Sequence, residues 1–294
     1  PVSPPAVVVG LLRAVRRDRD LALRERVAAA AAETAAKEAA ERAQLLTRYT
    51  PKCSAVFQDT LSPSCFHTAA KGLATSKTED LKASMQLMMT EQIITSPSQG
   101  LYTFPLLSVE FAQDLNAEIH HYEAAAKTDG LPLYYRHDGC MGSLQQCGFA
   151  PLLEALTLQV VQPLVNTILP DMGEVECYHA FLTRNFVGRD ASFKIHCDKS
   201  DLTLNICLHA TDDLEGSTVS FYTRPPEDGA VPTEADVCYR LTHSVGAAAF
   251  HTGQEWHKTN DLIKGERNSL IVWARRVHGQ SHVDGTVDVG ESNG

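Results

Sequence analysis

Two His-x-Asp triplets, at residues 196–198 and 282–284, are the first features of this sequence whose residue types and spacing could bind a metal. Residues two apart on a β-strand face the same side, so His196 and Asp198, at the end of a predicted strand, could direct a nitrogen and a carboxylate oxygen to one point. The alternative for this triplet alone is a half-buried strand end with a histidine–aspartate hydrogen bond. The second triplet lies in a glycine-rich tail with no later histidine and arginine, and we attribute it to chance.

His257 and Arg267 extend the pattern of the first triplet. Arg267 stands ten residues after His257, where another predicted strand begins. Two histidines and one carboxylate form the facial triad that holds non-haem Fe(II) and leaves three positions open. The guanidinium of Arg267 is a planar fork suited to a bidentate carboxylate, and Ser269 on the same strand face could add a hydroxyl. His251 competes with His257 for the third metal position, but it stands sixteen residues before Arg267, and we favour His257.

Other polar and aromatic residues near these positions have ordinary explanations. His209 and His243 are interpreted as strand-end histidines, and Trp273 as packing. Trp256 is interpreted as packing or as a wall of the substrate pocket. Cys197 lies between two candidate ligands and should point away from the metal by strand alternation.

The predicted secondary structure that must position these residues changes from mainly helical to mainly strand along the chain. Residues 12–48 lack Gly and Pro and are rich in Ala, Arg, Glu and Lys, which predicts a long helix ending before Pro51. We favour a solvated helix there over a partner-binding one, because its apolar stripe is mostly alanine. Short helices are predicted over 51–100, a strand-like piece at 101–108, and helices over 109–126 and 150–168.

The C-terminal half has the pattern of a β-domain. Strands are predicted at 178–186, 191–197, 201–208, 217–223, 237–243, 246–251 and 268–275. Seven short strands after a helical half are typical of a jelly-roll or sandwich backed by helices.

Composition limits the classes of protein to which the chain can belong. It has 294 residues, of which 44% are hydrophobic and 21% charged, so it can bury a core and is not a disordered protein. No apolar run approaches 18 residues, which argues against a membrane span. The net charge of −10 makes nucleic acid an unlikely partner. Eight cysteines without a Cys-x-x-Cys pair indicate free thiols in an intracellular protein, with the cytoplasm as the expected compartment.

Taken together, these motifs resemble the 2-oxoglutarate- and Fe(II)-dependent oxygenases of the prolyl/lysyl hydroxylase-like branch. Within that branch, the 2-oxoglutarate- and iron-dependent oxygenase domain-containing proteins are the most similar group. The resemblance extends over most of residues 45–276. The stretches that carry it are Tyr178–Phe181, His196–Leu208, Glu215-Gly216 with Phe221, His251–Gly253 with His257, and Gly265–Trp273.

The resemblance implies an α+β protein whose C-terminal half is a double-stranded β-helix (jelly-roll) core, with supporting helices and a helical N-terminal region. The corresponding divisions are an Ala-rich helix (1–50), a helical and loop region (51–100), supporting helices (101–175), the dioxygenase jelly-roll (176–276) and a flexible tail (277–294).

The resemblance also assigns roles to individual residues. His196, Asp198 and His257 would bind Fe(II). Arg267 would hold the distal carboxylate of 2-oxoglutarate, assisted by Ser269. The pocket would be completed by Thr203 and Asn205 beside the cosubstrate and by Tyr178, Asn185 and Trp256 as further candidates.

Two positions depart from the group's pattern. Asn185 stands where relatives often carry a tyrosine, and Gly216-Ser217 replaces a Gly-Gly pair. Asn185 removes an expected phenol near the cosubstrate. We expect the replacement of the second glycine by Ser217 to have little effect, because serine tolerates a turn.

The implied function is an Fe(II)- and 2-oxoglutarate-dependent dioxygenase that uses O2 and releases succinate and CO2, with ascorbate as reductant. A prolyl or lysyl side chain of a protein is the default substrate, and a small molecule is the alternative. A second hypothesis is a binding or scaffold protein that kept the barrel and lost turnover. A nucleic-acid demethylase is disfavoured by the acidic balance. Neither the substrate nor the oligomeric state follows from these residues.

Overall fold

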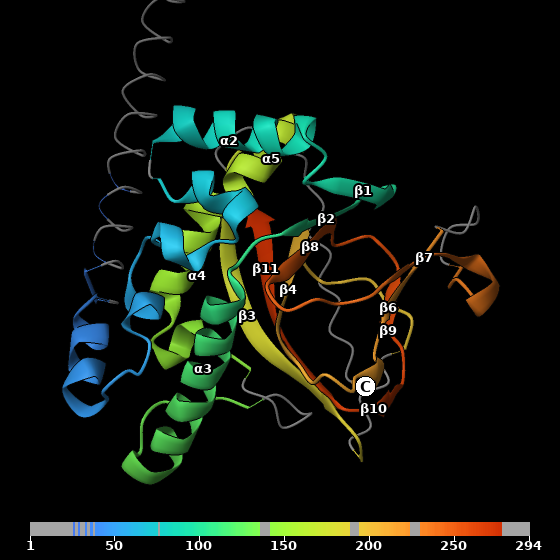
Figure 1. Cartoon of the computed structure of the whole chain (residues 1–294). Helices are drawn as coiled ribbons and strands as arrows, with labels where there is room; N and C mark the ends of the chain where they lie inside the picture. Colours follow the sequence, from blue (N-terminus) through green and yellow to red (C-terminus); the bar gives the residue numbers. More distant parts are fainter. Residues whose placement is uncertain are drawn as a thin grey trace, which may run out of the picture.

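The computed structural model describes residues 39–75, 77–135, 142–188, 194–223 and 230–277, together with residues 26, 29, 33, 36 and 37. Over these residues the fold is α+β, with helices on one side and antiparallel sheets on the other (Figure 1). The tail proposed at 277–294 lies outside the described residues except for Val277.

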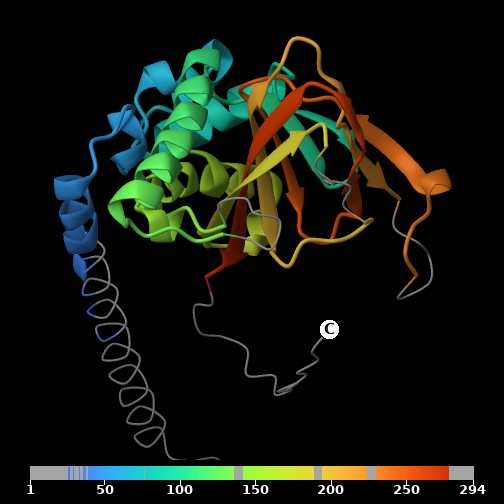
Figure 2. The ribbon, with the colours of Figure 1, turned by 90° about the horizontal axis from the view of Figure 1, so that it is seen from below.

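The N-terminal segment is helical at every described position between 26 and 48, as predicted, and its first part, 12–25, lies outside the described residues. The described side chains up to residue 44 are exposed or half-buried, and contact with the domain begins at Leu45 and Tyr49, which are buried. Residues 39–48 therefore form a helical segment at the edge of the helical layer (Figure 2).

Four α-helices follow along the chain: α2 (Thr78–Thr90), α3 (Val109–Asp129), α4 (Ala150–Leu156) and α5 (Gln162–Ile168). Helix α3 begins at Ser108, whose hydroxyl accepts the N–H of Phe111, and ends at Gly130 in the left-handed conformation. These are a serine N-cap and a glycine C-cap, so the sequence predicts both ends of this helix.

The helix predicted at 150–168 is present but is interrupted by a π-helical turn, η5 (Thr157–Val161), between α4 and α5. Pro163 has no N–H to donate to the preceding turn, which accounts for the break in the regular pattern. The side-chain amide of Gln159 in this turn is buried and bonds the backbone of Leu61 and Leu73. It thereby ties the 3-10 helix η3 (Thr68–Leu73), and the loop between η1 (Ser54–Phe57) and η2 (Pro63–Cys65), to the helical layer.

A six-stranded antiparallel sheet forms the centre of the molecule. Its strand order is β1-β2-β8-β4-β11-β3. The bounds are β1 (Thr95–Ser98), β2 (Leu101–Pro105), β3 (Val175–Phe186), β4 (Leu202–Ala210), β8 (Ala247–Thr252) and β11 (Glu266–Arg276). The sheet is thus completed by two strands from the N-terminal half. Strand β2 confirms the strand-like piece predicted at 101–108, whereas β1 lies in the region 51–100, for which we predicted helices and loops.

Two small sheets lie on the side of the large sheet away from the helices (Figure 1). The first has the order β7-β6-β9 and the second pairs β10 with β5. Their bounds are β5 (Glu215–Gly216), β6 (Val219–Tyr222), β7 (Val237–Leu241), β9 (His257–Thr259) and β10 (Leu262–Lys264). Helices α3 and α4 pack against β4 and β3, so the large sheet lies between a helical layer and the small sheets.

The prediction of a strand at 191–197 is wrong for the part that the structure describes. Residues 194–197 form no strand, and only an isolated bridge joins His196 to His257, while residues 191–193 lie outside the described residues. The argument that strand alternation aligns His196 with Asp198 therefore does not hold, and other contacts must align them.

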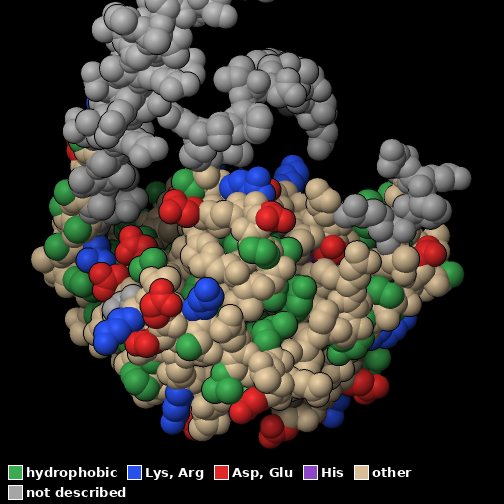
Figure 3. Space-filling view, turned by 90° about the horizontal axis from the view of Figure 1, so that it is seen from above, with side chains coloured by type: hydrophobic (Ala, Val, Ile, Leu, Met, Phe, Trp, Pro, Cys, Tyr) green, Lys and Arg blue, Asp and Glu red, His purple; other side chains and the backbone are tan. Residues whose placement is uncertain are grey.

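Charge and hydropathy on the described surface agree with the composition. On the face seen in Figure 3, Lys and Arg side chains lie among Asp and Glu side chains. None of the described helices has the length and apolar content needed to cross a bilayer. The seven cysteines of the described residues are free thiols.

Candidate metal centre and its cavity

His196, Asp198 and His257 meet at one point of the structure. Each offers one ligand atom, and the three atoms lie within 4.8 Å of one another. The Nε2 atoms of His196 and His257 are 3.7 and 3.8 Å from the same carboxylate oxygen, Oδ1 of Asp198. These separations are too long for hydrogen bonds, which excludes the His–Asp hydrogen bond as the explanation of the first triplet.

Backbone contacts between distant segments create this meeting point. His196 and His257 exchange two backbone hydrogen bonds, of 3.0 and 2.9 Å, and the N–H of Asp198 bonds the carbonyl of Gly253 at 2.9 Å. A Cβ on Gly253 would lie 1.7 Å from the carbonyl oxygen of Ser200, so only glycine fits there. The 196–200 segment is therefore held by the loop before β9 rather than by a strand of its own.

Both histidines are oriented as metal ligands usually are. The Nδ1 of His196 donates to the carbonyl of Lys194 at 2.8 Å, and the Nδ1 of His257 donates to that of Glu255 at 2.9 Å. Placing the proton on Nδ1 leaves the Nε2 lone pair of each neutral ring directed at the centre. Burial, and then the nearby His251, lower the pKa of His257 well below its usual value, so this ring is neutral at physiological pH.

Thr203 supports the carboxylate of this group. Its hydroxyl donates to Oδ2 of Asp198 and also contacts the Ser200 hydroxyl at 3.1 Å. Thr203 lines the cavity, as expected of a residue beside the cosubstrate, and its hydroxyl bonds the candidate metal ligand. Oδ1 is the oxygen that remains for a metal.

Arg267 lies at the other end of the same cavity and is 2% exposed. Its Nε donates to Ser217 Oγ at 2.9 Å and its NH1 to Ser269 Oγ at 2.8 Å. Among the described residues no carboxylate pairs with it. Burial lowers its pKa to about 10, which still leaves the guanidinium charged. A buried cation whose protein partners are two neutral hydroxyls is suited to an anionic ligand.

The two departures noted in the sequence come together at this arginine. Asn185 faces Arg267 across the β3–β11 pair, and its amide donates to Ser217 Oγ at 3.2 Å, the same oxygen that accepts from Arg267. Ser217 has a φ of +51°, a conformation that costs a serine more than a glycine. The expectation that Ser217 matters little overlooked its hydroxyl, which helps to orient Arg267.

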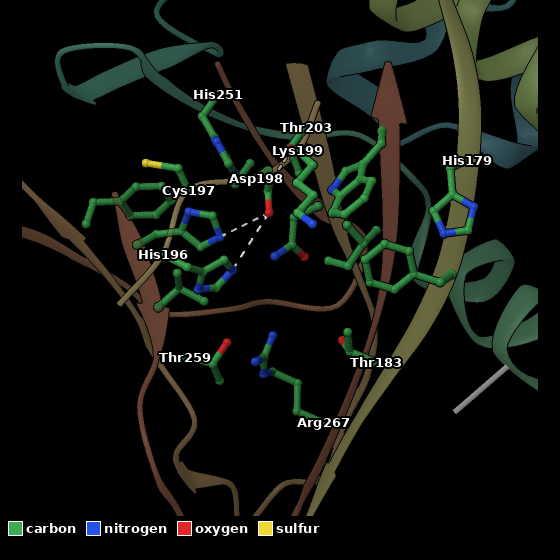
Figure 4. Close-up of a pocket in the computed structure, with 18 residues that line it drawn as sticks. His179, Thr183, His196, Cys197, Asp198, Lys199, Thr203, His251, Thr259 and Arg267 are labelled. Carbon is green, nitrogen blue, oxygen red and sulfur yellow. Dashed lines mark hydrogen bonds and ion pairs between the residues drawn. The ribbon is translucent and has the colours of Figure 1, made fainter. Parts of the chain in front are cut away.

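The cavity that joins the two ends has a volume of about 540 Å³. Figure 4 shows Arg267 pointing into it towards His196 and Asp198. Its floor is the inner face of the large sheet, where side chains form rows across paired strands. Residues 179, 273, 203 and 251 make one row, residues 181, 271, 205 and 249 the next, and Arg267 lies deeper along β11.

Some predicted pocket residues line this cavity and others do not. Asn205 lines it, and its buried Oδ1 has no hydrogen-bond partner. Tyr178, Asn185 and Trp256 are not among the lining residues, which corrects our pocket assignment. Tyr178 alternates with His179 and Phe181 on β3, so it faces the other side, where its hydroxyl bonds the carbonyl of Lys199 at 3.2 Å.

Three aromatic rings form one wall of the cavity, those of His179, Phe181 and Trp273, and Trp273 had been interpreted as packing. Their ring centroids are 5.4–5.7 Å apart. The signal was present in the sequence, because Trp273 follows Arg267, Ser269 and Ile271 at intervals of two on one strand.

His251 lines the cavity but does not belong to the group of three candidate ligands. Its ring centroid lies 4.9 Å from that of His257, and its Nδ1 donates to the carbonyl of Thr252 at 2.8 Å. The structure thus places His251 beside the candidate centre and His257 in it.

Comparison with known proteins adds to this geometry. An OGFOD2-like domain model matches residues 46–174, the region before most of the sheet strands. The 2-oxoglutarate and iron-dependent oxygenase domain-containing protein 2 of Mus musculus is 28% identical over 245 residues, covering 81% of this chain. The chain resembles the 2-oxoglutarate and iron-dependent oxygenase domain-containing proteins. The resemblance inferred from the motifs is therefore confirmed, and the domain model extends it over residues 46–174.

Two further similarities are weaker or cover less of the chain. The human multifunctional procollagen lysine hydroxylase and glycosyltransferase LH3 is 29% identical over 150 residues, covering 45% of this chain and 19% of that protein. A prolyl-4-hydroxylase structure from Pseudomonas putida has 17% identity and a TM-score of 0.40, and covers 67% of this chain and 95% of that one. The chain spans 66% of the length of the mouse relative.

Proposed function

We propose that this protein is an Fe(II)- and 2-oxoglutarate-dependent dioxygenase that hydroxylates a prolyl or lysyl side chain. The observation that carries the proposal is the presence, in one cavity, of a His196–Asp198–His257 cluster and a buried cation, Arg267, with which no carboxylate of the described residues pairs. The triad alone would fit several iron enzymes. The arginine is what makes 2-oxoglutarate the preferred cosubstrate.

The donor set fits iron. Ligands about 2.1 Å from a metal and about 90–110° apart are separated by roughly 3.0–3.4 Å, so the observed 3.7 and 3.8 Å require only small adjustments. Two neutral imidazoles and one carboxylate are the set that non-haem Fe(II) enzymes use. Bound iron with 2-oxoglutarate supplies the activation of O2, in which the cosubstrate is decarboxylated to succinate and CO2 and one oxygen atom enters the substrate.

Individual residues of the chain then have distinct tasks. His196, Asp198 and His257 hold the metal on one side and leave the other coordination positions open. Arg267, aligned by Ser217 and Ser269, binds the distal carboxylate of 2-oxoglutarate. Asn205 lines the stretch of cavity between Arg267 and the metal, where its unpartnered oxygen atom can meet a donor or an ordered water.

The fold that belongs with this function is a double-stranded β-helix. In this interpretation the large sheet and the β7-β6-β9 sheet are its two faces, and the candidate ligands lie between them. Ascorbate as the reductant that keeps the iron in the Fe(II) state is proposed from the resemblance alone. An intracellular location is proposed from the cysteine pattern of the sequence.

The proposal is tested by measuring succinate formation. Protein loaded with Fe(II) should convert 2-oxoglutarate to succinate in the presence of O2, at a slow uncoupled rate even without substrate. Isothermal titration with 2-oxoglutarate should show one site per chain only when a divalent metal is present. Metal and cosubstrate binding without any succinate would favour the alternative, a binding protein that has lost turnover. No 2-oxoglutarate binding at all would contradict the proposal.

The substrate itself is identified by mass spectrometry. Lysate proteins and small molecules treated with the enzyme, 2-oxoglutarate and Fe(II) are searched for products heavier by one oxygen atom. Modified peptides would favour a protein hydroxylase, and modified metabolites would favour the small-molecule alternative.

A further inference from the structure

A second cavity, which we call the outer cavity, lies on the helical side of the protein and has a volume of about 520 Å³. Cavities of about 300–1,000 Å³ are typical of sites for small organic ligands. One wall is the helical segment 39–48, and the opposite wall is formed by the loop after α3 and the start of α4. None of the described residues lines both this cavity and the one that holds the candidate metal centre.

The walls of the outer cavity are held at fixed positions. Gly148, just before α4, has a φ of +88°, and a Cβ on it would lie 2.2 Å from Cδ2 of Leu45, so the helical segment packs directly on the backbone of this turn. Arg48 ties the same segment to the end of α3, because its NH2 donates to the carbonyls of Asp129 and Gly130, at 2.5 and 3.4 Å. The cavity is therefore already formed without a ligand.

The charge of the outer cavity is positive although the whole chain is acidic. Arg42 is half-buried, and no described residue pairs with its guanidinium. Arg48 bonds only neutral carbonyls. Within the described residues, the one carboxylate of the lining is that of Glu41, which is exposed and lies 3.8 Å from the ammonium of Lys37. Two guanidinium groups without a carboxylate partner therefore face this cavity.

The rest of the lining offers apolar surface. Leu45 and Pro151 are buried, and Pro132 and Tyr134 complete this surface from the loop after α3. An apolar body gains by leaving water against these side chains, and an oxyanion gains charge-assisted hydrogen bonds from a guanidinium. A cationic ligand would meet two like charges. A metal ion would find a single carboxylate, fewer oxygen ligands than a hard cation requires.

We propose that the outer cavity binds a small organic anion, in which an oxyanion is attached to an apolar body. Arg42 pairs with the oxyanion, Arg48 adds a second positive charge, and the apolar body lies against Leu45 and Tyr134. The site is one side chain away from the metal cavity, because Gln145 lines the outer cavity and its amide lies 3.1 Å from Nδ1 of His179. This ligand site goes beyond the proposed function and does not depend on it.

Calorimetric titration with two matched probes tests the charge preference. The first probe, 2-naphthoate, is an aromatic carboxylate, and the second, 2-naphthamide, has the same ring and nearly the same shape without the charge. We expect 2-naphthoate to bind at concentrations about tenfold lower than 2-naphthamide, because only the carboxylate can pair with Arg42.

Variants of Arg42 locate the bound probe. Arg42→Gln should weaken binding of 2-naphthoate about tenfold and leave that of 2-naphthamide unchanged, which also shows that the variant is folded. Arg42→Lys should recover only part of the loss, because an ammonium lacks the planar fork of donors. The matched control is Arg240→Gln, which changes an exposed arginine that lines neither cavity and should alter neither titration.

Arg267→Ala distinguishes the two cavities, since Arg267 lines the metal cavity alone. We expect the site that depends on Arg42 to persist in this variant. Loss of 2-naphthoate binding in Arg267→Ala together with unchanged binding in Arg42→Gln would place the probe in the metal cavity and overturn the inference. Equal affinities for the two probes, or no binding of either, would overturn it as well. No metal or 2-oxoglutarate enters these titrations, so their failure would leave the proposed function untouched.

Discussion

The hydroxyl of Thr203 donates a hydrogen bond to Oδ2 of Asp198, and this bond leaves Oδ1 as the oxygen that faces both histidines. A carboxylate held in this way is prepared to bind a metal through one oxygen. Thr203 therefore acts on the metal through Asp198 and needs no contact with the cosubstrate.

Thr203→Val should weaken divalent metal binding roughly tenfold or more, the range typical of lost support to a metal ligand. Valine keeps the shape of threonine but has no hydroxyl, so Asp198 would be free to rotate. Thr203→Ser should bind metal nearly as the wild type does. Calorimetric metal titration in the absence of 2-oxoglutarate measures this directly. Equal affinities for wild type and the valine variant would remove Thr203 from this role.

The two His-x-Asp triplets can be separated by metal analysis. We expect one divalent metal per chain, lost in His196→Ala and in Asp198→Ala, because each variant leaves only two ligands. His282→Ala changes the second triplet, which lies outside the described residues, and should retain the metal. Elemental analysis after dialysis gives the stoichiometry. Full retention in both of the first two variants would disprove the site.

Replacing His257 and replacing His251 should have different effects on turnover. His257→Ala should abolish 2-oxoglutarate turnover, because it removes a ligand. His251→Ala should only lower the rate, because His251 packs beside His257 without joining the cluster. Succinate formation by the two variants decides between them, and a reversed order would require the site to be rebuilt around His251.

The two ends of the cavity differ in how far the sequence could predict them. Strand alternation on β11 places four side chains on one face of the sheet, and this common face can be predicted from local sequence. The four are Arg267, Ser269, Ile271 and Trp273. His196 and Asp198 are brought together by backbone bonds to residues 253 and 257, and no local pattern records such contacts. The triad was therefore found by residue type and order, while the strand assigned to it was wrong.

The same distinction explains why strand β1, the pairing of the predicted strand β2 and the role of the Ser217 hydroxyl were not predicted. Strands β1 and β2 join the large sheet by pairing β2 with β8, almost 150 residues away. Neither that pairing nor the bond between Ser217 and Arg267 follows from local composition. Helix α3, by contrast, has its cap signals at both ends and was placed within a few residues.

Arg267 is the residue that distinguishes a 2-oxoglutarate enzyme from any other iron site built on two histidines and an aspartate. Such a site needs the triad, but it needs no buried cation at the far end of the cavity. A 2-oxoglutarate enzyme does, because the distal carboxylate would otherwise lose its water without gaining a partner. Removing one member of a buried charge pair costs on the order of 3–5 kcal/mol, roughly a hundredfold or more in affinity.

Arg267→Ala should accordingly raise the concentration of 2-oxoglutarate needed for half-maximal succinate formation by about a hundredfold, while the metal still binds. Arg267→Lys should recover only part of the loss, because an ammonium cannot make two parallel hydrogen bonds to a carboxylate. The matched control is Arg275→Ala, which removes an exposed arginine near the far end of the same strand and leaves the cavity lining intact. Titration of 2-oxoglutarate against succinate in the four proteins gives the result. Superimposable curves for wild type and Arg267→Ala would remove 2-oxoglutarate from the proposed function even if iron remained, because nothing else in the described part of the cavity offers its distal carboxylate a buried cation.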